Sequence, residues 1–223
     1  QGLRPLELAS VKAQVCQGCH VGTDGKFASH DIMGAGHPRL QFELANYSAA
    51  LPEHHRIDDD YRARKSVATE LQLFSEGELQ AALNFLDGLR SERFDRGGMW
   101  PELAIFDCHA CHQPMNPVNW QERSLSRDLP TGAIRFNDSS LIMVTLLWKL
   151  RNSEAAANWQ EGIRALHRSS QKGMQPVQQV AGLLREQVQA MLRDFQQHPL
   201  TGEEAVKLTR EMVAYSRDQA FND

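Results

Sequence analysis

Two short cysteine motifs constrain this chain more than any other feature of its sequence. All four cysteines among the 223 residues belong to them: residues 16–20 read C-x-x-C-H, and residues 108–112 repeat the pattern. This is the attachment motif for c-type haem. Its two thiols add across the two vinyl groups of one porphyrin, and two intervening residues let one turn of backbone match the vinyl separation. The histidine beside the second cysteine is then held under the iron as its proximal ligand.

The motifs therefore predict two covalently bound haem c groups. The predicted residues are Cys16, Cys19 and proximal His20 for the first haem, and Cys108, Cys111 and proximal His112 for the second. Two other uses of the cysteines stay open. Paired C-x-x-C motifs can form a structural zinc site, although zinc does not explain the histidine in both motifs, and two disulfides can form in an oxidising compartment. A thioredoxin-like redox pair expects a βαβ context, which this sequence lacks.

The ligand on the far side of each iron decides what a haem can do. A second strong ligand makes the haem an electron carrier, whereas an open position allows catalysis or gas binding. Four of the nine histidines lie between the motifs, and we expect two of these to be distal ligands: His37, His30, His54 and His55. His37 is favoured because the nearby glycines permit close approach of the backbone to a flat macrocycle, and because Pro38, at the expected helix start, constrains the position of His37.

Other side chains near the motifs are candidates for holding a haem. Arg39 is a candidate partner for a haem propionate. Methionine is the less favoured distal ligand, and the candidates are Met33, Met99 and Met115. Burial of a porphyrin needs aromatic surface, for which we expect Trp100, Phe106 and Trp120.

Composition limits the class of protein and its partners. The hydrophobic content of 41% and charged content of 23% are ordinary for a folded globular chain. The formal net charge of −4 makes nucleic acid a poor expectation for the partner. The longest apolar stretch, residues 141–148, is too short to cross a bilayer, so no transmembrane segment is predicted in this chain. No signal peptide is present, and the start at Gln1 leads us to expect a processed or trimmed chain.

Helical periodicity dominates the sequence and strand patterns are nearly absent, so we predict an all-α fold. We expect a dihaem c-type cytochrome domain over residues 1–125, with little regular structure besides helices. An antiparallel helical bundle is expected over residues 137–220. Asp138, Pro176 and the capping pair of Thr201 and Glu204 are expected to begin helices there, with a further helix around 156–166.

The first domain carries weaker signals for its elements. Apolar residues at helical spacing predict a helix leading into the first motif. Pro38 is expected to open a helix that ends near Pro52, and residues 53–64 are expected to form a solvated loop. Ser75 and Glu78 form a capping-box pattern and are expected to begin a new helix after a helical stretch over residues 67–74.

The stretch from Val11 to Trp120 resembles multihaem cytochromes of the c554-like group. The resemblance rests on Ser-His-Asp at residues 29–31, Gly-Ala-Gly-His-Pro-Arg-Leu at residues 34–40 and Pro-Glu-His-His at residues 52–55, besides the haem motifs. It implies that such histidines serve as distal ligands, sometimes to a haem that is not the nearest in sequence. Because this chain has two haem motifs, the haem order and open-site haem of the tetrahaem members do not transfer to it.

These observations lead us to expect electron transfer through two haems, with both irons ligated by two histidines. Covalent haem attachment implies a bacterial periplasmic or otherwise extracytoplasmic location, and redox proteins as donor and acceptor. The C-terminal helices are candidates for forming a homodimer or a multihaem complex. Alternatives are a redox enzyme or ligand sensor with one open or weakly ligated haem, like the dihaem peroxidases, and a relay subunit of a larger complex.

Overall fold

The computed structural model describes residues 4–23, 26–52, 56–92, 102–112, 124–130 and 132–217. These residues contain no strand, only two isolated bridges, so the predicted all-α fold is confirmed. The longer helices are α1 (Ala9–His20), α5 (Glu70–Arg90), α6 (Ser139–Arg151), α7 (Ser153–Ser169), α8 (Met174–Gln197) and α9 (Gly202–Arg217). The short ones are α2 (His30–Gly34), α3 (Leu44–Ala50), α4 (Asp59–Arg64), and the 3₁₀ turns η2 (Leu103–Ile105), η3 (Cys108–Ala110) and η4 (Ser170–Lys172).

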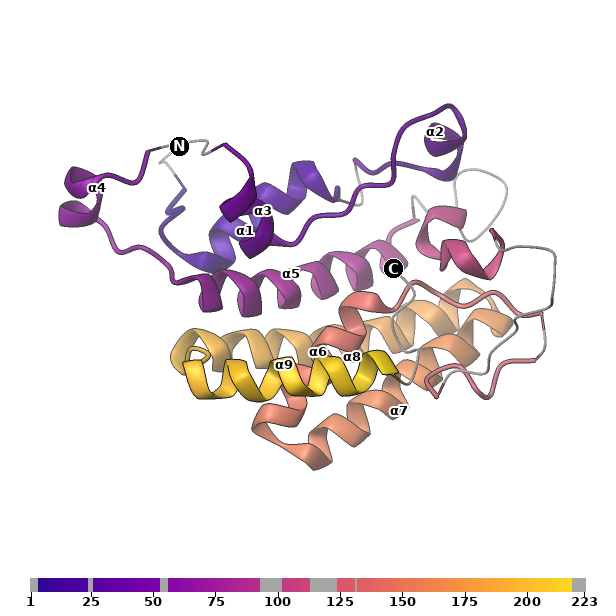
Figure 1. The fold of residues 1–223 in the computed structure, drawn as a ribbon. Helices are drawn as coiled ribbons and strands as arrows, with labels where there is room; N and C mark the ends of the chain where they lie inside the picture. Colours follow the sequence, from indigo (N-terminus) through magenta and orange to yellow (C-terminus); the bar gives the residue numbers. More distant parts are fainter. Residues whose placement is uncertain are drawn as a thin grey trace.

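Helix α5 crosses the middle of the molecule and packs on both sides. Figure 1 shows α1 and α3 above it and the C-terminal helices below it. One side of α5 buries leucines in the main core, including Leu79 and Leu86, which are fully buried. On the other side, a Cβ at Gly77 would lie 3.0 Å from the Leu44 side chain, so glycine lets α3 pack this closely without displacing Leu44.

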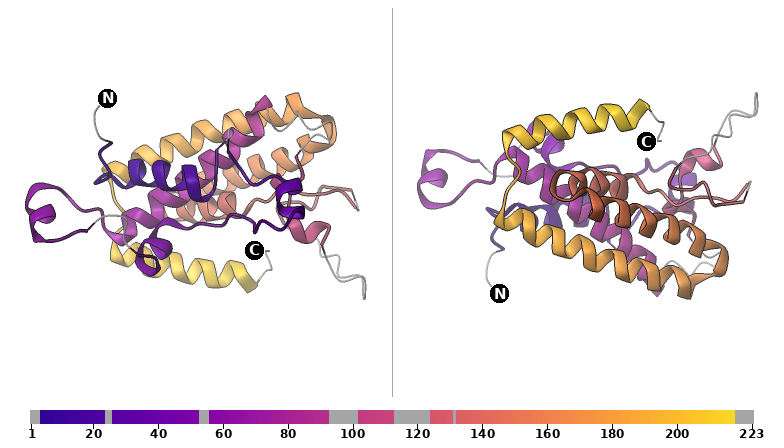
Figure 2. Two further views of the ribbon diagram at one scale, coloured as in Figure 1. Left: turned by 90° about the horizontal axis from the view of Figure 1, so that it is seen from above. Right: turned by 90° about the horizontal axis from the view of Figure 1, so that it is seen from below.

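The C-terminal helices form the predicted bundle, in which α7 packs against both α6 and α8. Buried apolar residues such as Trp159, Leu184 and Phe195 fill its core, and the Trp159 Nε1 donates to the Leu141 carbonyl oxygen at 3.0 Å. Helix α9 lies along one flank of the bundle, where it packs on α6 and buries one residue, Leu208 (Figure 2). The predicted capping pair of Thr201 and Glu204 is confirmed at its start.

The second cysteine motif is attached to the bundle by a short antiparallel pairing. Asp107 N donates to Arg135 O at 3.0 Å, and Asn137 N donates to Ile105 O at 3.0 Å. Between them the rings of Phe106 and Phe136 stack at 5.2 Å with an angle of 2°. The motif therefore begins from a buried, hydrogen-bonded support.

Three of the local expectations are wrong. Residues after Pro38 are extended and α3 begins at Leu44, because the Glu43 carboxylate caps it by accepting from Ala45 N and Asn46 N. Residues 59–64 are helical rather than a loop, since Asp58 caps α4.

The expected helix start at Ser75 and Glu78 is also wrong. Instead, one continuous helix, α5, begins at Glu70 and runs through both residues, because Thr69 and Gln72 form the capping box. Ser75 instead donates to the Leu71 carbonyl oxygen, and Glu78 lies within the helix.

The main core joins α5 to α6, α7 and α8, so residues on both sides of the expected boundary share one core. The division into domains over residues 1–125 and 137–220 stays a prediction about independent folding. Within the described part of the chain, no helix is both long and apolar enough to cross a membrane.

We expect Leu86→Ala to lower the free energy of unfolding by about 2–5 kcal/mol, because it leaves a cavity in the core that α5 shares with the bundle. Leu183→Ala is the matched control, since Leu183 is 63% exposed on α8. It should change the stability by less than about 0.5 kcal/mol. Urea denaturation followed by circular dichroism measures both, and equal effects of the two variants would contradict this assignment of the core.

Candidate functional site

The first cysteine motif forms the last turns of α1. Cys16 and Cys19 are three residues apart on this helix, so they share one face with His20. Cys16 packs against the small core of α1, α3 and α5, and burial raises the pKa of its thiol, whereas Cys19 is exposed. The His20 ring stacks on Phe42, with ring centroids 4.6 Å apart.

A residue inside this motif holds it in place. Gln17 is 1% exposed, its Nε2 donates to the Gly77 carbonyl oxygen at 2.8 Å, and its Oε1 accepts from Asn84 Nδ2 at 2.9 Å. These bonds fix the end of α1 on α5. Sequence reasoning treated Gln17 as a spacer; a long amide side chain between two cysteines gave no local signal of this role.

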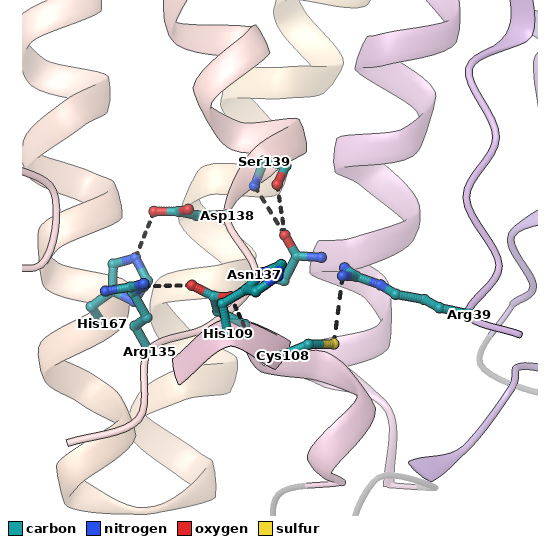
Figure 3. Close-up of polar contacts among 9 residues, drawn as sticks. Arg39, Cys108, His109, Arg135, Asn137, Asp138, Ser139 and His167 are labelled. Carbon is teal, nitrogen blue, oxygen red and sulfur yellow. Dashed lines mark hydrogen bonds and ion pairs between the residues drawn. The ribbon is translucent and has the colours of Figure 1, made fainter. Parts of the chain in front are cut away.

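The second cysteine motif has a different local structure. Cys108 begins the turn η3, and the Asp107 carboxylate caps it by accepting from His109 N at 2.9 Å. The same carboxylate pairs with Arg135 at 2.7 Å, and its side chain is 4% exposed. Cys111 and His112 are exposed. Figure 3 shows this network beside the buried pair of His167 and Asp138, which are 2.9 Å apart.

One predicted distal histidine lies beside a proximal one. The ring centroids of His30 and His112 are 6.3 Å apart, with 30° between their planes. An imidazole nitrogen binds a transition metal at about 2.0 Å, so two imidazoles on opposite sides of one metal ion have centroids roughly 6 Å apart. His30 begins α2, and its backbone N–H donates to the Glu102 carboxylate at 2.8 Å. The two segments are thus joined by a hydrogen bond as well as by the contact between the two rings.

The other distal candidates are not brought to a proximal histidine within the described residues. His37 is exposed, and its Nδ1 lies 2.6 Å from the Pro38 carbonyl oxygen, which leaves Nε2 available as a ligand. Gly36 before it has a φ of 105°, a conformation that favours glycine. His54 and His55 lie outside the described residues, as do Met99, Met115, Trp100 and Trp120.

Arg39 and Met33 reach a large cavity, and Phe106 does not line it. Arg39 Nη1 lies 3.6 Å from Cys108 Sγ (Figure 3). Porphyrin propionates lie on the edge opposite the vinyl groups, so this contact does not itself place Arg39 at a propionate of the same haem, and that role stays a prediction. Phe106 was expected as a pocket wall, but it packs in the main core against Phe136.

The cavity has a volume of 830 Å³ and extends between the two motifs. It is lined by Val21 and Gly22, which follow His20, and by Ala104 and Ile105, which precede the second motif. Helices α5, α6 and α9 supply further walls, largely apolar. Phe42 and Tyr47 also line it, and sequence reasoning missed both. An apolar space of this kind, beside residues that adjoin each motif, offers apolar surface to the flat face of a porphyrin.

Each alternative use of the cysteines, a zinc site or disulfides, requires a particular arrangement of the thiols. All four are in the described part of the chain, and all four are free thiols there. A zinc site built from both motifs needs the cysteines to converge, yet no three His, Cys, Asp or Glu side chains of the described residues form such a group. Among the described residues, the two motifs therefore do not converge on one zinc site.

A carboxyl group also lines the cavity. Burial raises the pKa of Glu78 to about 7, and the like charge of Glu43 adds to this effect. Glu78 is a residue that sequence reasoning assigned to a helix cap. A carboxylate on an otherwise apolar helix face, with Ala81 one turn away and Phe85 two turns away, was the available signal.

A comparison with protein-family models, with curated proteins and with solved structures found no match to this chain.

Glu78 should make the stability depend on pH. Because its pKa is raised in the folded state, the folded chain binds more protons than the unfolded chain between about pH 4.5 and pH 7, so stability falls as pH rises through this window. Glu78→Gln should remove this loss and be the more stable protein at pH 8, by on the order of 3 kcal/mol.

Urea denaturation across this pH range measures the effect. The control is Glu186→Gln, at an exposed position on α8, which should follow the wild type. Parallel curves for the wild type and Glu78→Gln would show that Glu78 has an ordinary carboxyl pKa.

Proposed function

We propose that this protein transfers electrons through two covalently bound c-type haems. The first is held by Cys16 and Cys19 with His20 as proximal ligand, and the second by Cys108 and Cys111 with His112. When bound, the haems supply one-electron redox chemistry. The chain's own residues attach the porphyrins, supply axial ligands and surround the macrocycles with apolar walls.

The observation that carries this proposal is the 6.3 Å separation of the His30 and His112 rings. It fits two imidazoles on one iron, and His30 is the only predicted distal candidate among the described residues that lies at such a distance from a proximal histidine. His30 then belongs to the haem of the second motif, although the first motif is nearer in sequence. The second distal ligand, for the haem of the first motif, comes from His37, His54 or His55.

Two strong ligands favour electron transfer over catalysis, because neither side of the iron is left for a substrate. The cavity walls support the same function, since they bring residues that directly follow the first motif and residues that precede the second to one largely apolar space. We also propose, from the covalent attachment, that the protein acts in the bacterial periplasm or another extracytoplasmic space. Its donor and acceptor are then redox proteins.

The haem content tests this proposal. Expressed with the c-type haem attachment machinery, the wild type should carry two haems per chain. The double variant Cys16→Ala with Cys19→Ala should carry one, and so should Cys108→Ala with Cys111→Ala, because each cysteine pair attaches its own porphyrin. Intact mass and the pyridine haemochrome spectrum count them. A wild type without haem, or a chain that binds zinc in its place, would refute the proposal.

The role of His30 has its own spectroscopic test. His30→Ala should convert one haem from low-spin to high-spin iron that binds carbon monoxide in the ferrous state. This change should vanish when Cys108 and Cys111 are also replaced by alanine, because the affected haem is then absent. His198→Ala is the control, since His198 lies at the exposed end of α8. Prompt carbon monoxide binding by the wild type would instead favour the enzyme or sensor with an open haem.

A further inference from the structure

The cavity between the motifs contains an acidic side chain that the electron-transfer proposal does not use. Glu78 lines it from α5, and no hydrogen bond or ion pair to Glu78 is found among the described residues. Both carboxylate oxygens of its neighbour Glu43 accept backbone hydrogen bonds: Oε1 accepts from Ala45 N at 2.8 Å, and Oε2 accepts from Asn46 N at 2.7 Å. Glu78 is thus the cavity carboxyl that is free to gain or lose a proton.

The groups that face Glu78 can be named from each element around the cavity. The titratable residues among its described walls are Arg39, Glu43, Tyr47 and Glu78 itself. Helix α9 contributes Thr209, Met212, Val213 and Ser216, and α6 contributes Ser139, Ser140 and Met143, so neither helix adds a charge to the wall. The nearby fixed anion of Glu43 and the burial of Glu78 both favour the protonated carboxyl.

We propose, on the basis of the proposed electron transfer, that Glu78 binds a proton from solvent when a haem beside the cavity accepts an electron, and releases it on oxidation. A bound haem would supply the one-electron redox chemistry, and a reduced redox protein would be the source of the electron. The proton taken up by Glu78 would then replace the positive charge lost at the haem, so that the charge of the region around the cavity stays constant. The same exchange runs in reverse when the electron leaves.

The expected size of the coupling follows from electrostatics. For a haem iron on the order of 10 Å from Glu78, removal of one unit of positive charge at an effective dielectric constant of about 20 would strengthen proton binding roughly tenfold. By linkage, the same factor acts on the reduction equilibrium. A tenfold change corresponds to ~59 mV for a one-electron couple.

Equilibrium redox titrations of the purified haem protein between about pH 5 and pH 9, either side of the Glu78 pKa of about 7, test the proposal. The midpoint potential of one haem in the wild type should fall as pH rises, by ~59 mV in total from this group. Glu78→Gln should lose this pH-dependent fall. Its midpoint potential should stay near the value that the wild type has at low pH, because a neutral amide resembles the protonated acid.

Glu76→Gln is the matched control on the same helix. Glu76 is 4% exposed and its pKa is also raised by burial, but it bonds to Ser10 and Gln196 and does not line the cavity. This variant should keep the wild-type pH dependence. Any slope from the haem propionates is common to all three proteins, so the comparison isolates Glu78.

A second variant keeps the test independent of how well Glu78→Gln folds. Glu43→Gln removes the neighbouring negative charge, so the potential should begin to fall at a lower pH than in the wild type. An unchanged pH dependence in both Glu78→Gln and Glu43→Gln, with two haems present, would overturn the proton coupling alone. Absence of haem from the wild type would overturn the coupling and the electron-transfer proposal together.

Discussion

The structure depends on the burial of two opposite sides of α5. One side fills the main core with leucines that meet α6, α7 and α8. The other side receives α1 and α3 through Gly77, whose missing side chain admits Leu44 and whose carbonyl oxygen accepts from Gln17. Because the first cysteine motif is the end of α1, and the cavity wall includes α5, this one helix sets the position of the motif relative to the space beside it.

The sequence predicts the parts of this structure that rest on local patterns. Helical periodicity predicts the C-terminal helices, and the Thr201 and Glu204 capping pair predicts the start of α9, because both signals are contained within a few residues. Glu78 shows why the rest could not be predicted. Its spacing from Ser75 is that of a capping box. The helix instead begins before both residues, because Thr69 caps it and the apolar pattern continues without a break through Ser75 and Glu78.

The candidate site shows the same division between local and long-range information. The six proposed attachment and proximal residues are predicted from spacing alone, since each motif lies within five consecutive residues. The contact between the His30 and His112 rings joins residues that are 82 positions apart in the sequence. The ion pair of Asp107 and Arg135 joins residues that are 28 positions apart. Such contacts are set by how helices pack, so the sequence favours His37 on its local setting and does not reveal that His30 lies beside His112.

Ligation by His30 would also bear on the fold itself. Helix α2 has no buried residue, so apolar packing does little to hold it over the second motif. A haem bound to Cys108 and Cys111 and ligated by His30 would close a loop of roughly 80 residues, and in the chain-entropy treatment a cross-link of that length stabilises by about 4 kcal/mol. The N-terminal segment that carries the distal histidine would then be fixed largely by the cofactor it helps to bind, so attachment of the second haem and ordering of α2 belong to one cooperative step.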